Sequence, residues 1–185
     1  KLEKDLNFTF GKKNLMATFH PETSGTSKIV EAIKNLFKAL ENFHDIKVIF
    51  TYPNSDIGSN EIKKLIHNYV SKNIDRAEVF NSLGQKKYFS TLSIVDGLIG
   101  NSSSGIIEAP SLKKGTINIG NRQDGRIQAT SIINSSYSYN SIVKSINKLY
   151  SKSYKKVIKA VKNPLDKGQS SKKCFDAIKN KKTYK

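Results

Sequence analysis

A doubly wound parallel α/β sheet is the fold that this chain of 185 residues predicts. Short apolar segments, typical of buried strands, alternate along the chain with longer segments whose apolar residues recur every three or four positions. Small and polar residues follow the apolar segments, as expected where a strand ends and a helix begins. Strands and helices that alternate at this spacing form parallel βαβ units with right-handed crossovers, and the chain length fits one domain.

The first half of the chain supplies three of the predicted strands, at residues 13–19, 46–52 and 76–80. Two amphipathic stripes predict helices over residues 27–43 and around residues 62–70. The first stripe consists of Ile29, Ile33, Leu36, Phe37, Leu40 and Phe43, and the second of Ile62, Leu65, Ile66, Tyr69 and Val70.

The second half continues the alternation. In chain order it predicts a short helix at 84–93, a strand at 95–100, a helix at 103–113, a strand at 115–120 and a weaker strand at 127–133. From Tyr139 onward the pattern is helical, with a break at residues 163–168 and a last helix that begins near Ser170 or Ser171.

Charge and cysteine content restrict the class of protein. The formal net charge is +17, but the lysines are spread over the predicted helices and Lys far outnumbers Arg, so nucleic-acid binding is not favoured and a basic RNA-binding module is kept as the alternative. A single cysteine, Cys174, excludes an internal disulfide. The sequence contains no apolar stretch of ~20 residues and no leader pattern, so we expect a cytoplasmic protein without a membrane partner.

Polar residues gather where the predicted strands end, and ligands of doubly wound sheets bind at the carboxyl ends of the strands. In chain order these residues are His20, then Asn54 and Asp56, then residues 101–105, and finally residues 121–126.

The segment LIGNSSSGIIEAP, residues 98–110, is typical of a strand that turns tightly into a helix. The hydroxyls of Ser102 and Ser103, with the backbone amides around Gly105, can bind phosphate oxygens there. His20 and Arg122 can neutralise further negative charge. A nucleotide diphosphate would therefore fit across these loops.

Glu108 lies one turn into the same predicted helix, among apolar neighbours. An unpaired carboxylate in such surroundings is costly, so we expect a partner, and a ribose 2′,3′-diol can donate two hydrogen bonds to it.

Each of these residues also has a structural explanation. Serines are common helix caps, His20 can be a satisfied loop histidine, and Asn54 can cap the helix that begins near Ser59. Arg122 and Arg126 flank Asp124, which predicts a competing ion pair.

Other nucleotide-binding motifs are absent from the sequence. It has neither a Walker loop nor a G-x-G-x-x-G fingerprint, and no cluster of metal ligands, so P-loop enzymes and ordinary dinucleotide dehydrogenases lose support.

Together, four motifs in this order resemble the hydrolysing UDP-N-acetylglucosamine 2-epimerases of sialic acid biosynthesis. The motifs are TFHPET (18–23), PNSDIGSNE (53–61), GNSSSGIIEAP (100–110) and INIGNRQDGR (117–126). The non-hydrolysing relatives carry an HRRE-like sequence in place of HPET, so the resemblance favours the hydrolysing branch.

The resemblance implies that this chain is the carboxyl-terminal, nucleotide-binding half of a glycosyltransferase-B-type fold built from two Rossmann-like halves. His20 would contact the diphosphate and serve in catalysis. The implied UDP-binding residues are His20, Asn54, Tyr88, Ser102, Ser103, Gly105, Glu108 and Arg122.

For the complete protein the resemblance implies elimination of UDP from UDP-N-acetylglucosamine, then hydration to N-acetylmannosamine, with no metal or redox cofactor. Alternatives are the same chemistry on UDP-N,N′-diacetylbacillosamine, in legionaminic acid synthesis, and a glycosyltransferase of the same fold. The carboxylates for proton transfer would belong to the missing amino-terminal half. This half alone is therefore expected to bind UDP weakly and to be inactive, and the complete protein is expected to form homo-oligomers.

The domain boundaries expected from these patterns are an interdomain connection over residues 1–12, a Rossmann-like domain over 13–162, and a C-terminal helix with a Lys-rich tail over 163–185.

Overall fold

A six-stranded, fully parallel sheet forms the centre of the computed structural model, which describes residues 1–22, 26–166 and 168–179. The strand order is β3-β2-β1-β4-β5-β6, so the chain winds outward in both directions from β1 and β4. The strands are β1 (Lys13–Thr18), β2 (Ile46–Thr51), β3 (Ala77–Phe80), β4 (Gly97–Gly100), β5 (Gly115–Ile119) and β6 (Ile132–Ser135). This arrangement confirms the predicted doubly wound, Rossmann-like α/β fold.

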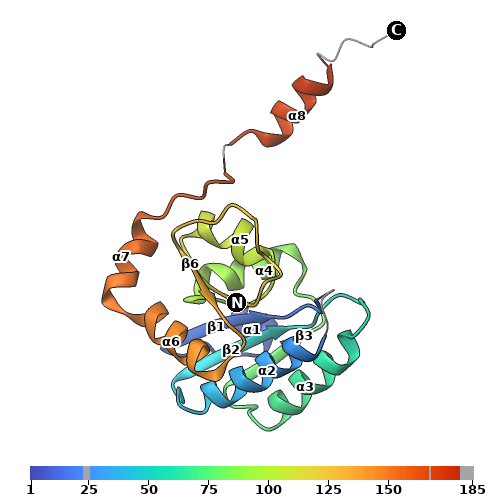
Figure 1. Cartoon of the computed structure of the whole chain (residues 1–185), viewed down its shortest axis with the longest axis vertical. Coiled ribbons are helices and arrows are strands. Elements are labelled where there is room, and N and C mark those ends of the chain that lie inside the picture. The colour runs from blue at the N-terminus through green and yellow to red at the C-terminus, as the bar shows by residue number, and fades with distance from the viewer. Residues whose placement is uncertain (23–25, 167, 180–185) are drawn as a thin grey trace.

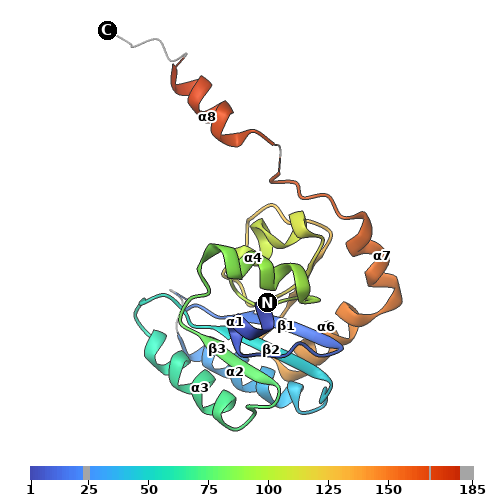
Figure 2. The same cartoon turned by 180° about the vertical axis from the view of Figure 1, so that it is seen from behind.

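Helices cover both faces of the sheet (Figures 1 and 2). On one face lie α2 (Thr26–Leu40), α3 (Ser59–Ser71) and α6 (Tyr139–Tyr150). On the other lie α1 (Leu2–Leu6), α4 (Gly84–Ile94), α5 (Ser104–Ile107) and the 3₁₀ helix η1 (Ala109–Leu112). The chain ends with α7 (Lys152–Ala160) and α8 (Ser170–Lys179).

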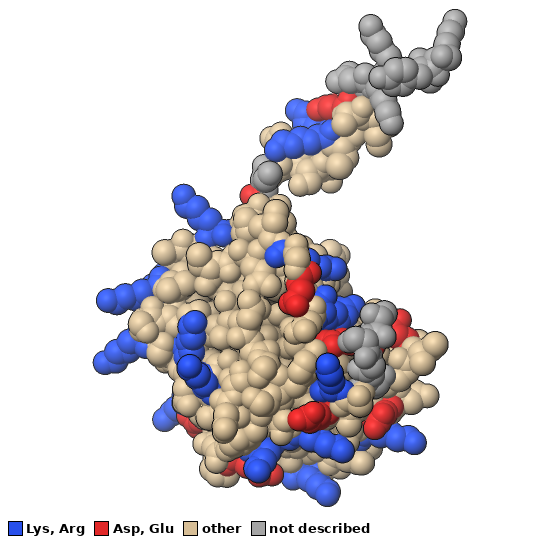
Figure 3. Space-filling model, in the orientation of Figure 1, with Lys and Arg blue, Asp and Glu red and all other residues tan. Residues whose placement is uncertain are grey.

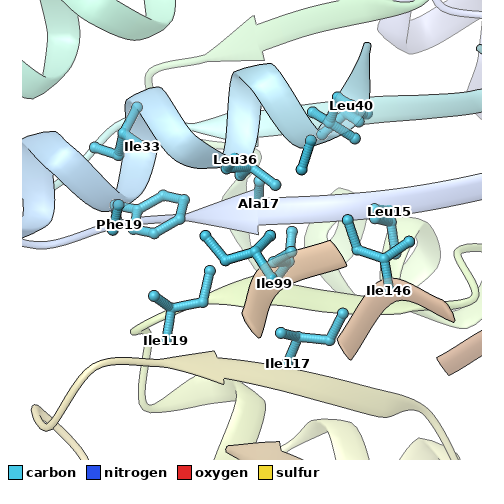
Figure 4. Close-up of a cluster of buried hydrophobic side chains, with 14 of the residues drawn as sticks. Leu15, Ala17, Phe19, Ile33, Leu36, Leu40, Ile99, Ile117, Ile119 and Ile146 are labelled. Carbon is cyan, nitrogen blue, oxygen red and sulfur yellow. The ribbon is translucent and has the colours of Figure 1, made fainter. Parts of the chain in front are cut away.

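Each face of the sheet has its own apolar core. The larger core packs α2, α3 and α6 against inward-facing strand residues such as Leu15, Ile99 and Ile117 (Figure 4). The two predicted stripes supply it, because the 3.6-residue helical period brings those side chains to one face.

The smaller core reaches into the first twelve residues, which the sequence assigned to a connection. Leu6 and Phe8 are buried there with Met16, Leu92 and Leu98. The segment therefore packs on the domain, and the boundary at residue 12 stays a prediction.

Helix α8 carries no buried residue, and it extends from the rest of the chain in Figures 1 and 2. The tail beyond residue 179, and Thr23 at the end of the HPET motif, lie outside the described residues. In the part of the chain that the structure describes, no helix combines the length and apolarity needed to cross a membrane.

Three element predictions need correction. The continuous helix expected over 103–113 is wrong: α5 stops at Ile107 and η1 follows, because Pro110 has no N–H to donate and its ring obstructs the carbonyl four residues earlier. The last strand is shifted to Ile132–Ser135, after a turn in which the Ile132 N–H donates to the Ala129 carbonyl. The helical region from Tyr139 is divided at Ser151, whose hydroxyl caps α7 by accepting from the Tyr154 N–H.

Candidate functional site

The site begins where β1 and β4 end side by side, with Thr18 paired to Gly100. Gly100 has φ +134°, and a Cβ built on it would lie 2.0 Å from the Thr18 carbonyl oxygen. Only glycine lets the two backbones approach this closely. Because of this close approach, the next residue, Asn101, lies at the end of β1. Its N–H donates to the same Thr18 oxygen at 3.2 Å.

Asn101 is fully buried and holds the loop that carries His20. Its Oδ1 accepts from the His20 N–H at 2.7 Å, and its Nδ2 donates to the His20 carbonyl at 2.9 Å. A side-chain amide thus satisfies both backbone groups of a residue 81 positions away. These two bonds fix the position from which the imidazole projects.

The backbone carbonyl of Asn101 binds side chains of the loop after β5. It accepts from Gln123 Nε2 at 2.7 Å and from Arg122 Nη1 at 3.2 Å. The sequence suggested a competing ion pair between Arg122 and Asp124, and the structure does not form it. Among the described residues the one ion pair joins Lys13 and Asp45. Arg122 is exposed and keeps most of its donors for a ligand.

His20 is half-buried and interacts electrostatically with Arg122 and Asp56. Burial lowers the pKa of its imidazole below the ordinary value near 6.5, Arg122 lowers it further, and Asp56 partly opposes the shift. The imidazole is therefore neutral at pH 7. Its Nδ1 atom is buried and has no hydrogen-bond partner among the residues that the structure describes, so the interpretation of His20 as a satisfied loop histidine does not hold for this ring atom.

Residues 101–105, which we call the serine loop, follow β4 and contact Thr116 of β5 through Gly105. Ser102 Oγ accepts from the Ser104 N–H at 3.4 Å, and Ser103 is the N-cap residue of α5 without a side-chain cap bond. The hydroxyl of Ser103 is thus not consumed by helix capping. Because α5 has only four residues, local N–H and hydroxyl donors matter here more than a helix dipole.

Gly105 performs a packing role in this loop. Its N–H already donates to the Ser102 carbonyl at 3.2 Å, and its own carbonyl accepts from Thr116 Oγ1 at 2.8 Å. A Cβ at this position would lie 2.5 Å from the Thr116 methyl. Glycine therefore allows α5 to lie directly on β5, and its own amide is not free for a phosphate.

Tyr88 and Glu108 both contact Ser104, the first residue of α5. The Tyr88 hydroxyl is hydrogen-bonded to Ser104 Oγ. Burial raises the pKa of Tyr88, the bond to Ser104 opposes the rise, and the Glu108 carboxylate adds to it. Glu108 Oε2 is buried without a partner, so the donor expected for this carboxylate is not supplied by the described residues.

Asn54 is less integrated than the other predicted site residues. Its side chain is exposed, and among the described residues its one hydrogen bond is to its backbone carbonyl, which accepts from Ser59 Oγ at 2.5 Å. The capping interpretation is wrong, because Gly58 is the N-cap residue of α3 and no side chain caps it. The loop nevertheless lies close to the site, since Asp56 acts on the His20 pKa.

Apart from Asn54, the predicted residues thus form two groups joined by residues 100–108. One contains His20 and Arg122 around Asn101, and the other contains Tyr88 and Glu108 around Ser104. Within the described ranges, no cluster of three metal-ligating side chains occurs.

Sequence reasoning missed the organising roles of Asn101, Gln123 and Ser104. Asn101 and Ser104 belong to the predicted loop, but nothing in the sequence pairs Asn101 with His20 or Ser104 with Tyr88. The only available signal was their position at strand ends, where all the partners converge.

The fold and the site together define a class, a Rossmann-like α/β domain whose polar side chains gather at the carboxyl ends of β1, β4 and β5. Within that class the chain belongs to the UDP-N-acetylglucosamine 2-epimerase family, whose family model matches residues 1–179.

Among curated relatives, the chain is 39% identical over 154 residues to the "GDP/UDP-N,N'-diacetylbacillosamine 2-epimerase (hydrolyzing)" of Campylobacter jejuni, covering 83% of this chain and 40% of that protein. It is 35% identical over 168 residues to the "Polysialic acid biosynthesis protein P7" of Escherichia coli, covering 88% of this chain and 42% of that protein. The chain therefore spans less than half the length of these relatives.

Solved structures agree on the fold. The S. aureus MnaA–UDP co-structure matches with a TM-score of 0.75 at 13% identity, over 97% of this chain and 47% of that chain. The UDP-GlcNAc 2-epimerase of Neisseria meningitidis bound to UDP-GlcNAc matches with a TM-score of 0.68 at 16% identity, over the same shares of the two chains. The chain shares the fold of about half of each of these two solved structures.

Proposed function

We propose that this chain is the nucleotide-binding half of a hydrolysing 2-epimerase that converts a UDP-linked 2-acetamido sugar into UDP and a free 2-epimeric sugar. The observation that carries the proposal is a pair of buried atoms without partners among the described residues, His20 Nδ1 beside Asn101 and Glu108 Oε2 beside Ser104. Each needs a partner that the described residues do not supply, and a nucleoside diphosphate offers both kinds.

In this proposal the ribose hydroxyls donate to Glu108, beside Tyr88. The hydroxyls of Ser102 and Ser103, with Arg122 and His20, bind the diphosphate and stabilise the charge that develops as UDP leaves. Asn54 completes the nucleotide contacts from the loop after β2. A bound diphosphate favours the protonated imidazole of His20, which can then donate a hydrogen bond or its proton to the departing phosphate, and this is the catalytic role proposed for it.

The names of the relatives support a hydrolysing reaction and suggest two candidate substrates for the complete protein. UDP-N-acetylglucosamine is the substrate implied by the sequence motifs, and a 32% identical relative from N. meningitidis carries that name. UDP-N,N′-diacetylbacillosamine is the second candidate, because relatives from C. jejuni and Legionella pneumophila are named for it. Assaying the complete protein with each sugar nucleotide, and identifying the sugar released, distinguishes the two.

We further propose that proton transfer at the sugar uses carboxylates from the other half of the complete protein. Remote binding energy from the nucleotide would then hold the sugar between the halves, and closure would exclude water until hydration. The complete protein is proposed to act in the cytoplasm as a homo-oligomer, without a metal or redox cofactor.

UDP should raise the melting temperature of this chain in a manner that depends on Glu108. With a Kd of about 1 mM for a half-site, about 10 mM UDP adds about 1.4 kcal/mol of stability, which is a shift of about 4 °C for a domain of this size. Glu108→Gln should remove most of this shift, measured by differential scanning fluorimetry, because the amide replaces an acceptor of the ribose hydroxyls.

The matched control is Glu61→Gln, an exposed carboxylate on α3, which should leave the UDP response intact. An equal loss in both variants would contradict the assigned contact. Tight RNA binding with a steep salt dependence, and no response to UDP, would instead favour the basic RNA-binding module.

Binding of UDP should be linked to proton uptake at His20. The free imidazole is neutral at pH 7 because burial and Arg122 lower its pKa, and a neighbouring diphosphate raises that pKa again. Affinity should therefore increase as pH falls through the pKa of the bound form toward the lower pKa of the free form, and level off below it. Calorimetry in buffers of different ionisation enthalpy measures the uptake, and His20→Gln isolates it from titration of UDP itself.

A further inference from the structure

A cavity lies at the opposite end of the strands from the candidate site. It has a volume of about 220 Å³ and opens where β4 and β5 begin, beside α7. Leu149, Tyr150 and Ile158 form its apolar lining. Lys113, Lys114, Lys155 and Lys159 surround them, and Figure 3 shows basic side chains projecting from the side on which α7 lies in Figure 1.

The single acidic residue in this lining is already engaged. Asp96 Oδ2 accepts from the Asn14 N–H at 2.8 Å and from the Tyr150 hydroxyl at 3.3 Å. None of the four lysines forms an ion pair within the part of the chain that the structure describes. Four ammonium groups therefore share one cavity with one carboxylate, an excess of positive charge.

One of the lysines is held at the cavity by a backbone carbonyl, and a second is partly buried there. Lys113 has φ +53°, and its Nζ donates to the Lys159 carbonyl at 3.2 Å, which joins the end of η1 to α7. Lys114 is half-buried, and burial lowers the pKa of its ammonium group while Asp96 opposes the shift. Like charges collected in a partly desolvated cavity favour occupation by an anion.

We propose that this cavity binds a small phosphorylated molecule whose ring or apolar body lies on Leu149, Tyr150 and Ile158. Lysine binds phosphate as a point charge, so several lysines together favour a phosphate dianion as the ligand. A carboxylate ligand is bound with better geometry by arginine. The volume equals that of about seven liquid-water molecules at ~30 Å³ each, enough for a phosphate group and a small organic body. This site is independent of the proposed UDP site.

Titrations of the chain with phenyl phosphate, inorganic phosphate and phenol, at constant ionic strength, test the proposal. Methyl signals of Leu149 and Ile158 should shift with phenyl phosphate. Phenyl phosphate should bind about tenfold more tightly than inorganic phosphate, because it also buries its ring, and phenol should bind more weakly still.

Variants locate the binding. Lys114→Gln and Lys155→Gln should each lower the affinity for phenyl phosphate by about fivefold or more. Lys64→Gln, which changes an exposed lysine on α3, should leave that affinity unchanged. Equal weakening by Lys64→Gln would show a general charge effect and overturn the proposal. Loss of binding in Arg122→Gln would place the probe at the other site and would also overturn it, as would equal affinity for the two phosphates.

Discussion

Gly100→Ala should prevent this chain from folding stably. The added Cβ would lie 2.0 Å from the Thr18 carbonyl oxygen, which is backbone and cannot rotate away, and the residue has φ +134°. Relief of the clash requires β1 and β4 to separate at the centre of the sheet. We expect a loss of at least about 4 kcal/mol, a large part of the 5–15 kcal/mol that typically stabilises a domain.

Urea unfolding followed by circular dichroism measures this loss. Gly84→Ala is the matched control, because Gly84 also has a positive φ, +64°, but no atom lies within 4 Å of the Cβ position. That control should lose only the ~1–2 kcal/mol of a left-handed L-residue. Similar losses in the two variants would show that the approach of β4 to β1 is not the constraint.

Asn101→Ala should have the second-largest effect, on both stability and nucleotide binding. The substitution removes the acceptor of the His20 N–H and the donor to the His20 carbonyl, leaving two backbone groups without their partners. With about 1–3 kcal/mol for each unsatisfied buried group, and His20 only half-buried, we expect a loss of about 2–4 kcal/mol. The UDP-induced rise in melting temperature should fall as well, because the imidazole loses its fixed position.

Two comparisons identify the cause of that loss. Asn101→Asp keeps the shape and the acceptor but loses the donor, so its stability should lie between those of the natural chain and Asn101→Ala. Asn60→Ala, on the exposed face of α3, should stay within about 0.5 kcal/mol of the natural chain. A loss under about 1 kcal/mol for Asn101→Ala would contradict the clamping role.

Strands and amphipathic helices were predictable because their signals are local. The buried strand at 13–19 and the stripe from Ile29 to Leu40 each reflect a period that the backbone geometry imposes on a few neighbouring residues. The shortened α5 was also a local matter, since Pro110 is visible in the sequence, but its apolar neighbours masked the break. Packing decided the helix at residues 2–6, because burial of Leu6 and Phe8 against Met16 and Leu98 stabilises a segment whose own pattern is weak.

For the candidate site too, some features were predictable from the sequence and others were not. The convergence of His20, the serine loop and Arg122 was predictable, because the carboxyl ends of parallel strands share one edge of the sheet. The division of labour within the serine loop was not. Gly105 packs against Thr116 while the Ser103 hydroxyl is free of capping, a difference that depends on how close α5 lies to β5.

By itself, the sequence determined the order and type of most elements, the doubly wound topology and the edge of the sheet that carries the polar loops, because these follow from hydrophobic periodicity and from the geometry of βαβ units. Only the tertiary structure decided that Asn101 binds both backbone groups of His20, that Tyr88 contacts Ser104, and that the two lysines after η1 and two lysines of α7 line one cavity. Such contacts join residues tens of positions apart, and their free energy depends on distances and burial that no local pattern encodes.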